Sequence, residues 1–90
     1  MPQLTASQLE QIVTTALPGA VVTVRDDTHK HLEHNHDVNH HGGHYLITVT
    51  WSGFANMARM ARHRKVMALF QEAWQQGQIH SLSLRLKTPA

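Results

Sequence analysis

Cysteine is absent from the 90 residues of this sequence, and its absence excludes several kinds of chemistry. The chain forms no disulfide, no zinc site built from thiolates and no cysteine nucleophile. A metal bound by this chain must therefore be held by histidine or carboxylate, or share its site with a partner that supplies thiolates.

Long apolar runs and secretory features are absent as well. No apolar segment approaches the about 18 residues that are needed to span a bilayer. Residues 1–5 lack the basic and apolar regions of a secretory signal. The sequence therefore predicts a cytoplasmic protein without a membrane span.

Features of an enzyme are also missing. No nucleophile stands beside a base, no paired carboxylates indicate a pocket, and no phosphate-binding loop is present, so we expect no enzymatic activity. Charged residues make up 16% of the chain and the formal net charge is +2. Charge alone is therefore a weak argument for a nucleic-acid partner.

The residues that are present suffice for one folded domain. Hydrophobic residues make up 41% of the chain, which is enough for a core and too many for a disordered segment. A chain of this length forms one domain, here residues 1–90, and no internal repeat or linker is visible.

Apolar periodicity predicts a helix and a strand near the N-terminus. The helix spans Thr5–Leu17, where Thr5 and Gln8 have the spacing of a capping box, and Pro18-Gly19 ends it. The valine-rich segment Ala20–Arg25 is typical of a strand.

The remaining segments predict two strands and two helices after a polar loop at residues 26–43. A strand at Tyr45–Trp51 alternates apolar and polar residues, and a last strand spans Ile79–Lys87. Between them we expect a short helix from Asn56, as N-cap, to Ala61, and a longer helix from about His63 to Gln75.

The predicted order is therefore α-β-β-α-α-β, an α/β (α+β) fold with a three-stranded sheet and the helices on one face. This arrangement buries every apolar stripe. The aromatic side chains fit core positions, and they are Trp51, Phe54, Phe70 and Trp74. The methionines Met57, Met60 and Met67 fit core or near-core positions.

Histidine is far above ordinary usage, with nine residues in the chain. Seven of them fall within sixteen positions of the loop region, namely His29, His31, His34, His36, His40, His41 and His44. Such a cluster suits Zn, Ni, Cu or Co, and the sequence does not select among these metals. The alternatives are a solvated polar loop without a metal and a loop that senses pH.

His80 is the foremost candidate ligand outside the loop, because it lies at the start of the last strand, where a ligand is held rigidly. Strand alternation places it on the face of Leu82, Leu84 and Leu86. The alternative is a buried histidine bonded to the backbone. For His44, alternation predicts a side chain that points away from His80 unless a bulge intervenes, so His44 is a secondary ligand or a structural cap.

A cluster of cations marks the predicted start of the longer helix, and its members are Arg59, Arg62, His63, Arg64 and Lys65. A short helix, a turn and a longer helix resemble a helix-turn-helix, whose second helix enters the major groove of DNA. The same cations suit glutathione carboxylates or an acidic partner face. The third interpretation is a solvated helix start.

Several segments in one order resemble the BolA family. The matching residues are Val24-Arg25-Asp26-Asp27-Thr28 with His31, His44-Tyr45, Phe54 with Arg62-His63-Arg64, Ile79-His80-Ser81-Leu82-Ser83-Leu84, and Thr88-Pro89. The resemblance covers roughly residues 5–89. Asn56 departs from it, because the family usually has glycine there, and the loop is unusually rich in histidine.

The resemblance implies a fold similar to a class II KH domain and a monothiol glutaredoxin as partner. It implies an adaptor in iron–sulfur trafficking or iron sensing, with a [2Fe–2S] cluster that takes sulfur from glutaredoxin and glutathione. His80 and the loop residue His31 would give the histidine ligands, and His29, His34 or His36 are close enough in sequence to replace His31. Some members are described as DNA-binding transcriptional regulators, so DNA binding and metal sensing through the loop stay as alternatives.

Overall fold

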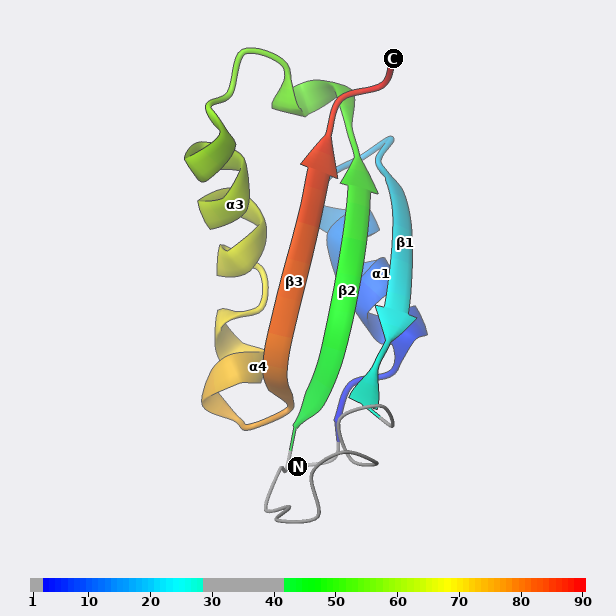
Figure 1. The fold of residues 1–90 in the computed structure, drawn as a ribbon, viewed down its shortest axis with the longest axis vertical. Helices are drawn as coiled ribbons and strands as arrows, with labels where there is room; N and C mark the ends of the chain where they lie inside the picture. Colours follow the sequence, from blue (N-terminus) through cyan, green and yellow to red (C-terminus); the bar gives the residue numbers. More distant parts are fainter. Residues whose placement is uncertain (1–2, 29–41) are drawn as a thin grey trace.

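The structure is a computed structural model that describes residues 3–28 and 42–90. Its elements are α1 (Ala6–Ala16), β1 (Val21–Asp26), β2 (Gly43–Thr50), a 3-10 helix η1 (Ser52–Phe54), α3 (Arg59–Ala68), α4 (Gln71–Gln75) and β3 (Ile79–Lys87). The predicted order α-β-β-α-α-β and the α+β class are confirmed (Figure 1). None of the described helices is long and apolar enough to cross a membrane.

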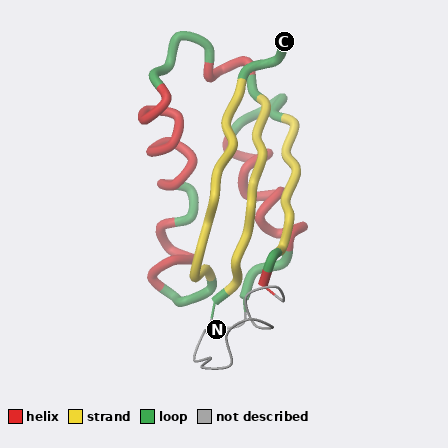
Figure 2. Tube along the Cα trace, in the orientation of Figure 1, coloured by secondary structure: helices red, strands yellow, loops and turns green. Residues whose placement is uncertain are grey.

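The three strands form one sheet in the order β1-β2-β3 (Figure 2). The central strand β2 runs antiparallel to β1 and parallel to β3. Along β2 the side chains of Tyr45, Ile47 and Val49 are buried in the core, whereas Leu46 and Thr48 between them are half-buried. Because side chains alternate across a strand, the sheet has one covered face and one open face. Figure 1 looks onto the open face, with α1 behind the sheet.

Helix α1 begins where the sequence predicts. The Thr5 hydroxyl accepts a hydrogen bond from the Gln8 backbone N–H, and the Gln8 side chain accepts one from the Thr5 N–H. Both halves of a capping box are therefore formed. The stripe of Leu9, Val13 and Leu17 is almost fully buried against the sheet, in agreement with the predicted apolar face.

The predicted helix boundaries after β2 are wrong. Asn56 is not an N-cap: it has φ 66°, a left-handed conformation that a right-handed helix does not accommodate. After glycine, asparagine is among the residues that adopt this conformation most readily. Helix α3 begins at Arg59, and Phe70, with φ −109° and ψ 11°, separates it from α4.

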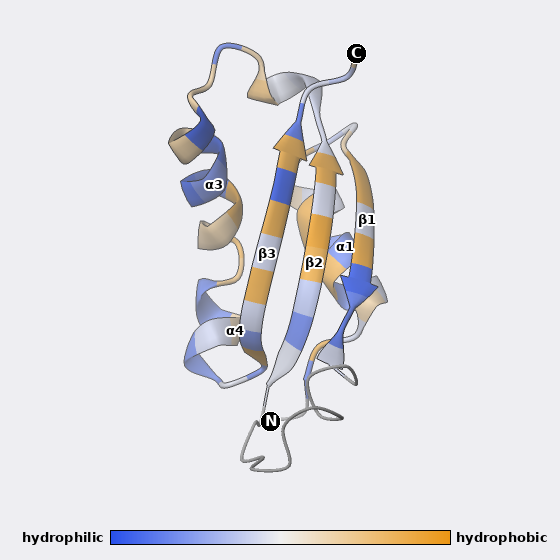
Figure 3. Ribbon diagram, in the orientation of Figure 1, coloured by the Kyte–Doolittle hydropathy of each residue, from blue (hydrophilic) through white to orange (hydrophobic). Residues whose placement is uncertain are grey.

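Met60 is 60% exposed, so the prediction that it fills a core or near-core position is wrong. Val66 is the fully buried residue of α3. Six residues along a helix correspond to a rotation of about 600°, which turns Met60 roughly 120° away from Val66. The predicted core aromatics Phe54 and Phe70 are buried, and Trp51 and Trp74 pack against the core. Figure 3 shows hydrophobic residues alternating with more hydrophilic ones along β3.

Tyr45 ties the segment before α1 to the sheet. Its hydroxyl donates a hydrogen bond to the carbonyl of Leu4, and its side chain is 3% exposed. The pKa of Tyr45 is raised from 10.0 to about 12, mainly by burial and to a smaller extent by the negative charge of Asp26. The folded state therefore holds the phenolic proton more tightly than the unfolded chain does.

We expect the folded protein to lose stability as the pH rises from 10 towards 12. The stabilisation that comes from the raised pKa of Tyr45 is fully present below pH 10 and is lost as the pH rises through the folded-state pKa of about 12. In this range the free energy of unfolding falls by at most about 1.4 kcal/mol per pH unit. Urea unfolding at a series of pH values measures this slope. Tyr45→Phe is the control, and an equal slope in both proteins would contradict the prediction.

Candidate functional site

The structure tests only part of the predicted histidine cluster. His29, His31, His34, His36, His40 and His41 lie outside the described residues. The histidines that can be placed are His44 on β2, His63 on α3 and His80 on β3.

His44 and His80 lie side by side. Their ring centroids are 4.8 Å apart and the ring planes are tilted by 46°. His44 is 5% exposed, and His80 is exposed. The prediction that His44 points away from His80 is therefore wrong, and the two candidate ligands form one site at the end of the sheet.

An irregularity in the β2–β3 pairing brings the two rings together. Gly43 is paired with Ile79, but His44 is paired with Ser81, so His80 is an extra residue in β3. An extra residue in one strand shifts every side chain before it to the other face. Ile79 is consequently buried in the core, and His80 leaves the predicted leucine face to join His44.

Gly42 permits this close approach of the chain to the start of β3. A β-carbon on Gly42 would lie 2.7 Å from the backbone nitrogen of His80 and 2.7 Å from the carbonyl carbon of Ile79. The neighbouring Gly43 N–H donates to the carbonyl of Gln78 at 3.2 Å. Gly42 is not among the site residues predicted from the sequence, although the Gly-Gly pair just before His44 is a signal for a close backbone approach.

The backbone of His44 is held from the end of β1. Its N–H donates to the Thr28 hydroxyl at 3.1 Å, and its carbonyl accepts from the Asp27 N–H at 2.7 Å. The Thr28 hydroxyl in turn donates to a carboxylate oxygen of Asp26. This chain of hydrogen bonds gives Asp26 and Thr28, noted in the sequence only as part of a family motif, a positioning role.

A small cavity of about 270 Å³ opens beside His44 on the open face of the sheet. Arg25 and Asp27 line it and form an ion pair at 2.9 Å. Ser81 and Ser83 of β3 line it from the other side. The surroundings of the histidine pair are therefore polar.

Two imidazoles at this separation suit a shared metal. Metal–nitrogen bonds are about 2.0–2.1 Å long, so two nitrogens on one ion lie about 3 Å apart. With ring centroids 4.8 Å apart, one nitrogen of each ring can lie within reach of a common ion. Residues 3–28 and 42–90 contain no group of three or more metal-ligating side chains, so further ligands must come from elsewhere.

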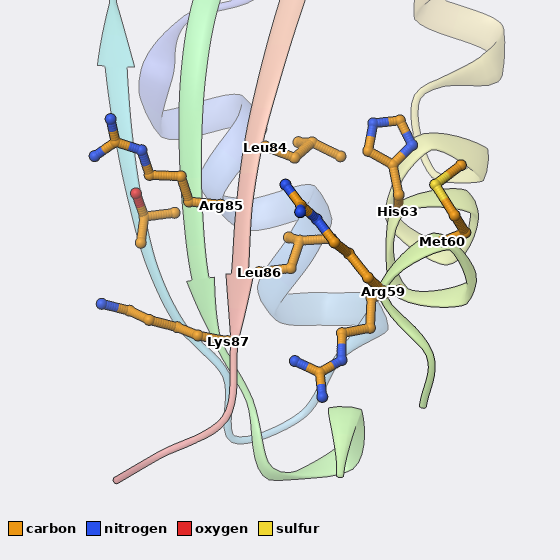
Figure 4. Close-up of a pocket in the computed structure, with 9 residues that line it drawn as sticks. Arg59, Met60, His63, Leu84, Arg85, Leu86 and Lys87 are labelled. Atoms are coloured by element: carbon orange, nitrogen blue, oxygen red, sulfur yellow. The ribbon is translucent and has the colours of Figure 1, made fainter. Parts of the chain in front are cut away.

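Only three of the five residues in the predicted cation cluster line the same groove. Arg59, Arg62 and His63 line a groove of about 960 Å³ between α3 and β3, together with Arg85 and Lys87 (Figure 4). Arg64 and Lys65 do not line it. Arg85 and Lys87 are not among the cations predicted from the sequence, although alternation along β3 places both on one face.

Two of the predicted DNA-binding cations make contacts within the fold. The Arg62 guanidinium lies over the Phe54 ring at 5.7 Å and donates through Nε to the Met57 carbonyl at 3.1 Å. The Lys65 ammonium lies 5.9 Å from the Trp51 ring. Because α3 begins at Arg59, residues 62–64 lie within the helix and not at its start, contrary to the prediction.

Comparison with known proteins gives one consistent family. The BolA family model, described as BolA-like protein, matches residues 13–90. BolA1 from Arabidopsis thaliana is 25% identical, with a TM-score of 0.74 over 93% of this chain and 90% of that chain. The BolA domain of SufE1 from the same plant is 24% identical, with a TM-score of 0.75 over 93% and 91%.

A bolA protein homologue from Coxiella burnetii is 23% identical, with a TM-score of 0.66 over 97% of this chain and 94% of that chain. No protein with a curated description matches this sequence. The three solved structures, with TM-scores of 0.66 to 0.75, agree with the fold described above.

We expect Gly42→Ala to separate the two histidine rings and to lower stability by about 1–3 kcal/mol, because the clashing atoms belong to the backbone and cannot rotate away. Nuclear Overhauser contacts between the rings and urea unfolding measure the two effects. Gly19→Ala, at φ 87° with no described atom within 4 Å of the new β-carbon, is the control that loses stability and keeps the ring contact. An unchanged ring contact in Gly42→Ala would contradict the proposed role of Gly42.

Proposed function

The chain belongs to the BolA-like protein family, and on this basis we propose that it is an adaptor that donates histidine to a [2Fe–2S] cluster shared with a monothiol glutaredoxin. The observation that supports the proposal is the pairing of His44 with His80. A role in iron–sulfur trafficking or iron sensing in the cytoplasm, without enzymatic activity, belongs to the same proposal.

The residues of this chain fit half of such a site. With no cysteine, the chain supplies imidazole only, and glutaredoxin with glutathione would supply the thiolates. Histidine in place of thiolate on one iron raises the reduction potential of a [2Fe–2S] cluster. The exposed His80 is placed to reach across to a partner, while hydrogen bonds fix the backbone of His44.

The second histidine ligand has two candidates. The geometry favours His44, whose ring neighbours that of His80. The family resemblance favours the loop residue His31, which lies outside the described residues. Binding of Zn, Ni, Cu or Co by the loop histidines remains a separate proposal that rests on the sequence alone.

DNA binding by Arg59, Arg62, His63, Arg64 and Lys65 has less support from the geometry. Arg62 and Lys65 lie over aromatic rings of the fold. The helix that follows α3 has only five residues. A recognition helix whose N-terminal residues reach base edges is therefore poorly matched here.

We expect this protein, titrated anaerobically into cluster-loaded monothiol glutaredoxin, to change the visible circular dichroism of the cluster. His80→Ala should abolish or alter the new spectrum, because it removes the exposed imidazole. His44→Ala and His31→Ala identify the second ligand, since only loss of a ligand should change the spectrum of the mixed complex. His63→Ala, on α3, is the matched control.

A wild-type protein that leaves the spectrum unchanged would rule out the shared cluster. A spectrum that is new and equal in wild type and His80→Ala would rule out His80 as a ligand. Far-ultraviolet circular dichroism of each variant separates loss of a ligand from loss of the fold.

A further inference from the structure

Strand β3 has an edge that no described strand covers. In the order β1-β2-β3 it pairs with β2 on one side only. An edge strand directs alternate backbone N–H and C=O groups away from its neighbour, where they are available for another strand. This free edge of β3 faces α3 (Figure 1).

The groove along this edge has an apolar floor. Leu84 and Leu86 point from β3 towards α3 (Figure 4), and Met60 of α3 also lines the groove. Met60 is 60% exposed, so the groove leaves a large apolar side chain uncovered. Apolar side chains of a bound segment would gain free energy by burial there.

The rims of the groove are cationic. Arg59 and His63 lie on the helix side, and Arg85 and Lys87 lie on β3 with side chains that extend away from α3 (Figure 4). Arg62 also lines the groove, and its guanidinium lies over the Phe54 ring. No aspartate or glutamate lines the groove. The ion pair between Arg25 and Asp27 is the one salt bridge among the described residues, so the rim cations have no described carboxylate to neutralise them. The groove therefore suits a negatively charged occupant.

The lining favours a peptide over single-stranded nucleic acid. Nucleic-acid grooves stack bases on aromatic side chains, and no phenylalanine, tyrosine or tryptophan lines this groove. A free strand edge beside a helix instead matches the recognition of extended peptides by strand addition, in which main-chain hydrogen bonds give affinity and side-chain contacts give specificity.

We infer that the groove between α3 and β3 binds an extended acidic peptide segment of a partner protein, which pairs with β3 as a fourth strand. Alternate side chains of the segment contact the leucines and Met60, and its carboxylates contact the rim cations. This site uses neither His44 nor His80, so it does not rest on the proposed cluster ligation. Of its cations, Arg85 also lines the small cavity beside His44, whereas Arg59 does not.

The test uses fluorescence anisotropy with a labelled peptide of about six residues that alternates glutamate and valine, the length of a typical strand. Two further peptides carry N-methyl groups on alternate amides, one in each frame. Strand pairing predicts that one frame weakens binding by about tenfold or more and the other leaves it unchanged, since only every second amide donates to β3. Binding that is insensitive to both frames would overturn the inference.

Charge reversal on the protein tests the rims. Arg59→Glu and Arg85→Glu should each weaken peptide binding by about tenfold or more, with a smaller loss at high salt. Arg64→Glu is the matched control, because it makes the same change on the same helix but outside the groove. Far-ultraviolet circular dichroism confirms that each variant is folded.

Three further outcomes would overturn the inference. They are equal weakening by Arg64→Glu and Arg59→Glu, no binding of the peptide at millimolar concentration, and tighter binding of a single-stranded oligonucleotide of the same net charge. The last outcome would assign the groove to nucleic acid. None of them bears on the cluster titration, so the two proposals fail or succeed separately.

Discussion

Strand β2 is hydrogen-bonded on both sides, and the regularity of these two ladders decides the direction of every side chain in the sheet. Since side chains alternate with a period of two, one extra residue reverses the face of all residues before it. The extra residue is His80. It keeps Ile79 in the core and turns an imidazole towards His44, so the candidate site exists because the ladder is irregular at one position.

The irregular pairing is held from both flanks. On one flank, Gly42 approaches the backbone of Ile79 and His80 more closely than any residue with a β-carbon could. On the other, Thr28 fixes the backbone of His44 and is itself fixed by Asp26. Site geometry of this kind is preorganised, since both candidate ligands sit on strands whose positions are set by backbone contacts.

The sequence predicts the elements well where burial imposes a period. The capping box at Thr5 and the alternation in β2 and β3 identify α1, the strands and the covered face. The bulge at His80 could not be predicted in this way. Assigning side chains to alternate faces assumes a regular ladder, and no residue pattern within β3 marks the extra position. The N-cap predicted at Asn56 is wrong for a similar reason. Asparagine is common both at helix N-caps and in the left-handed backbone conformation, and only the tertiary structure decides which of the two it adopts.

The two candidate sites lie near opposite ends of β3. With a rise of about 3.3 Å per residue, His80 and Lys87 are about 23 Å apart along the strand. Perturbations at such a distance usually add, so a change of charge at Arg59 should leave the histidine pair unaffected. Arg85 is different, because it lines both the groove and the small cavity beside His44. A single partner that engages both ends needs a segment long enough to span this distance. Such a partner would bind more tightly than either site alone allows, because the second contact becomes intramolecular once the first has formed.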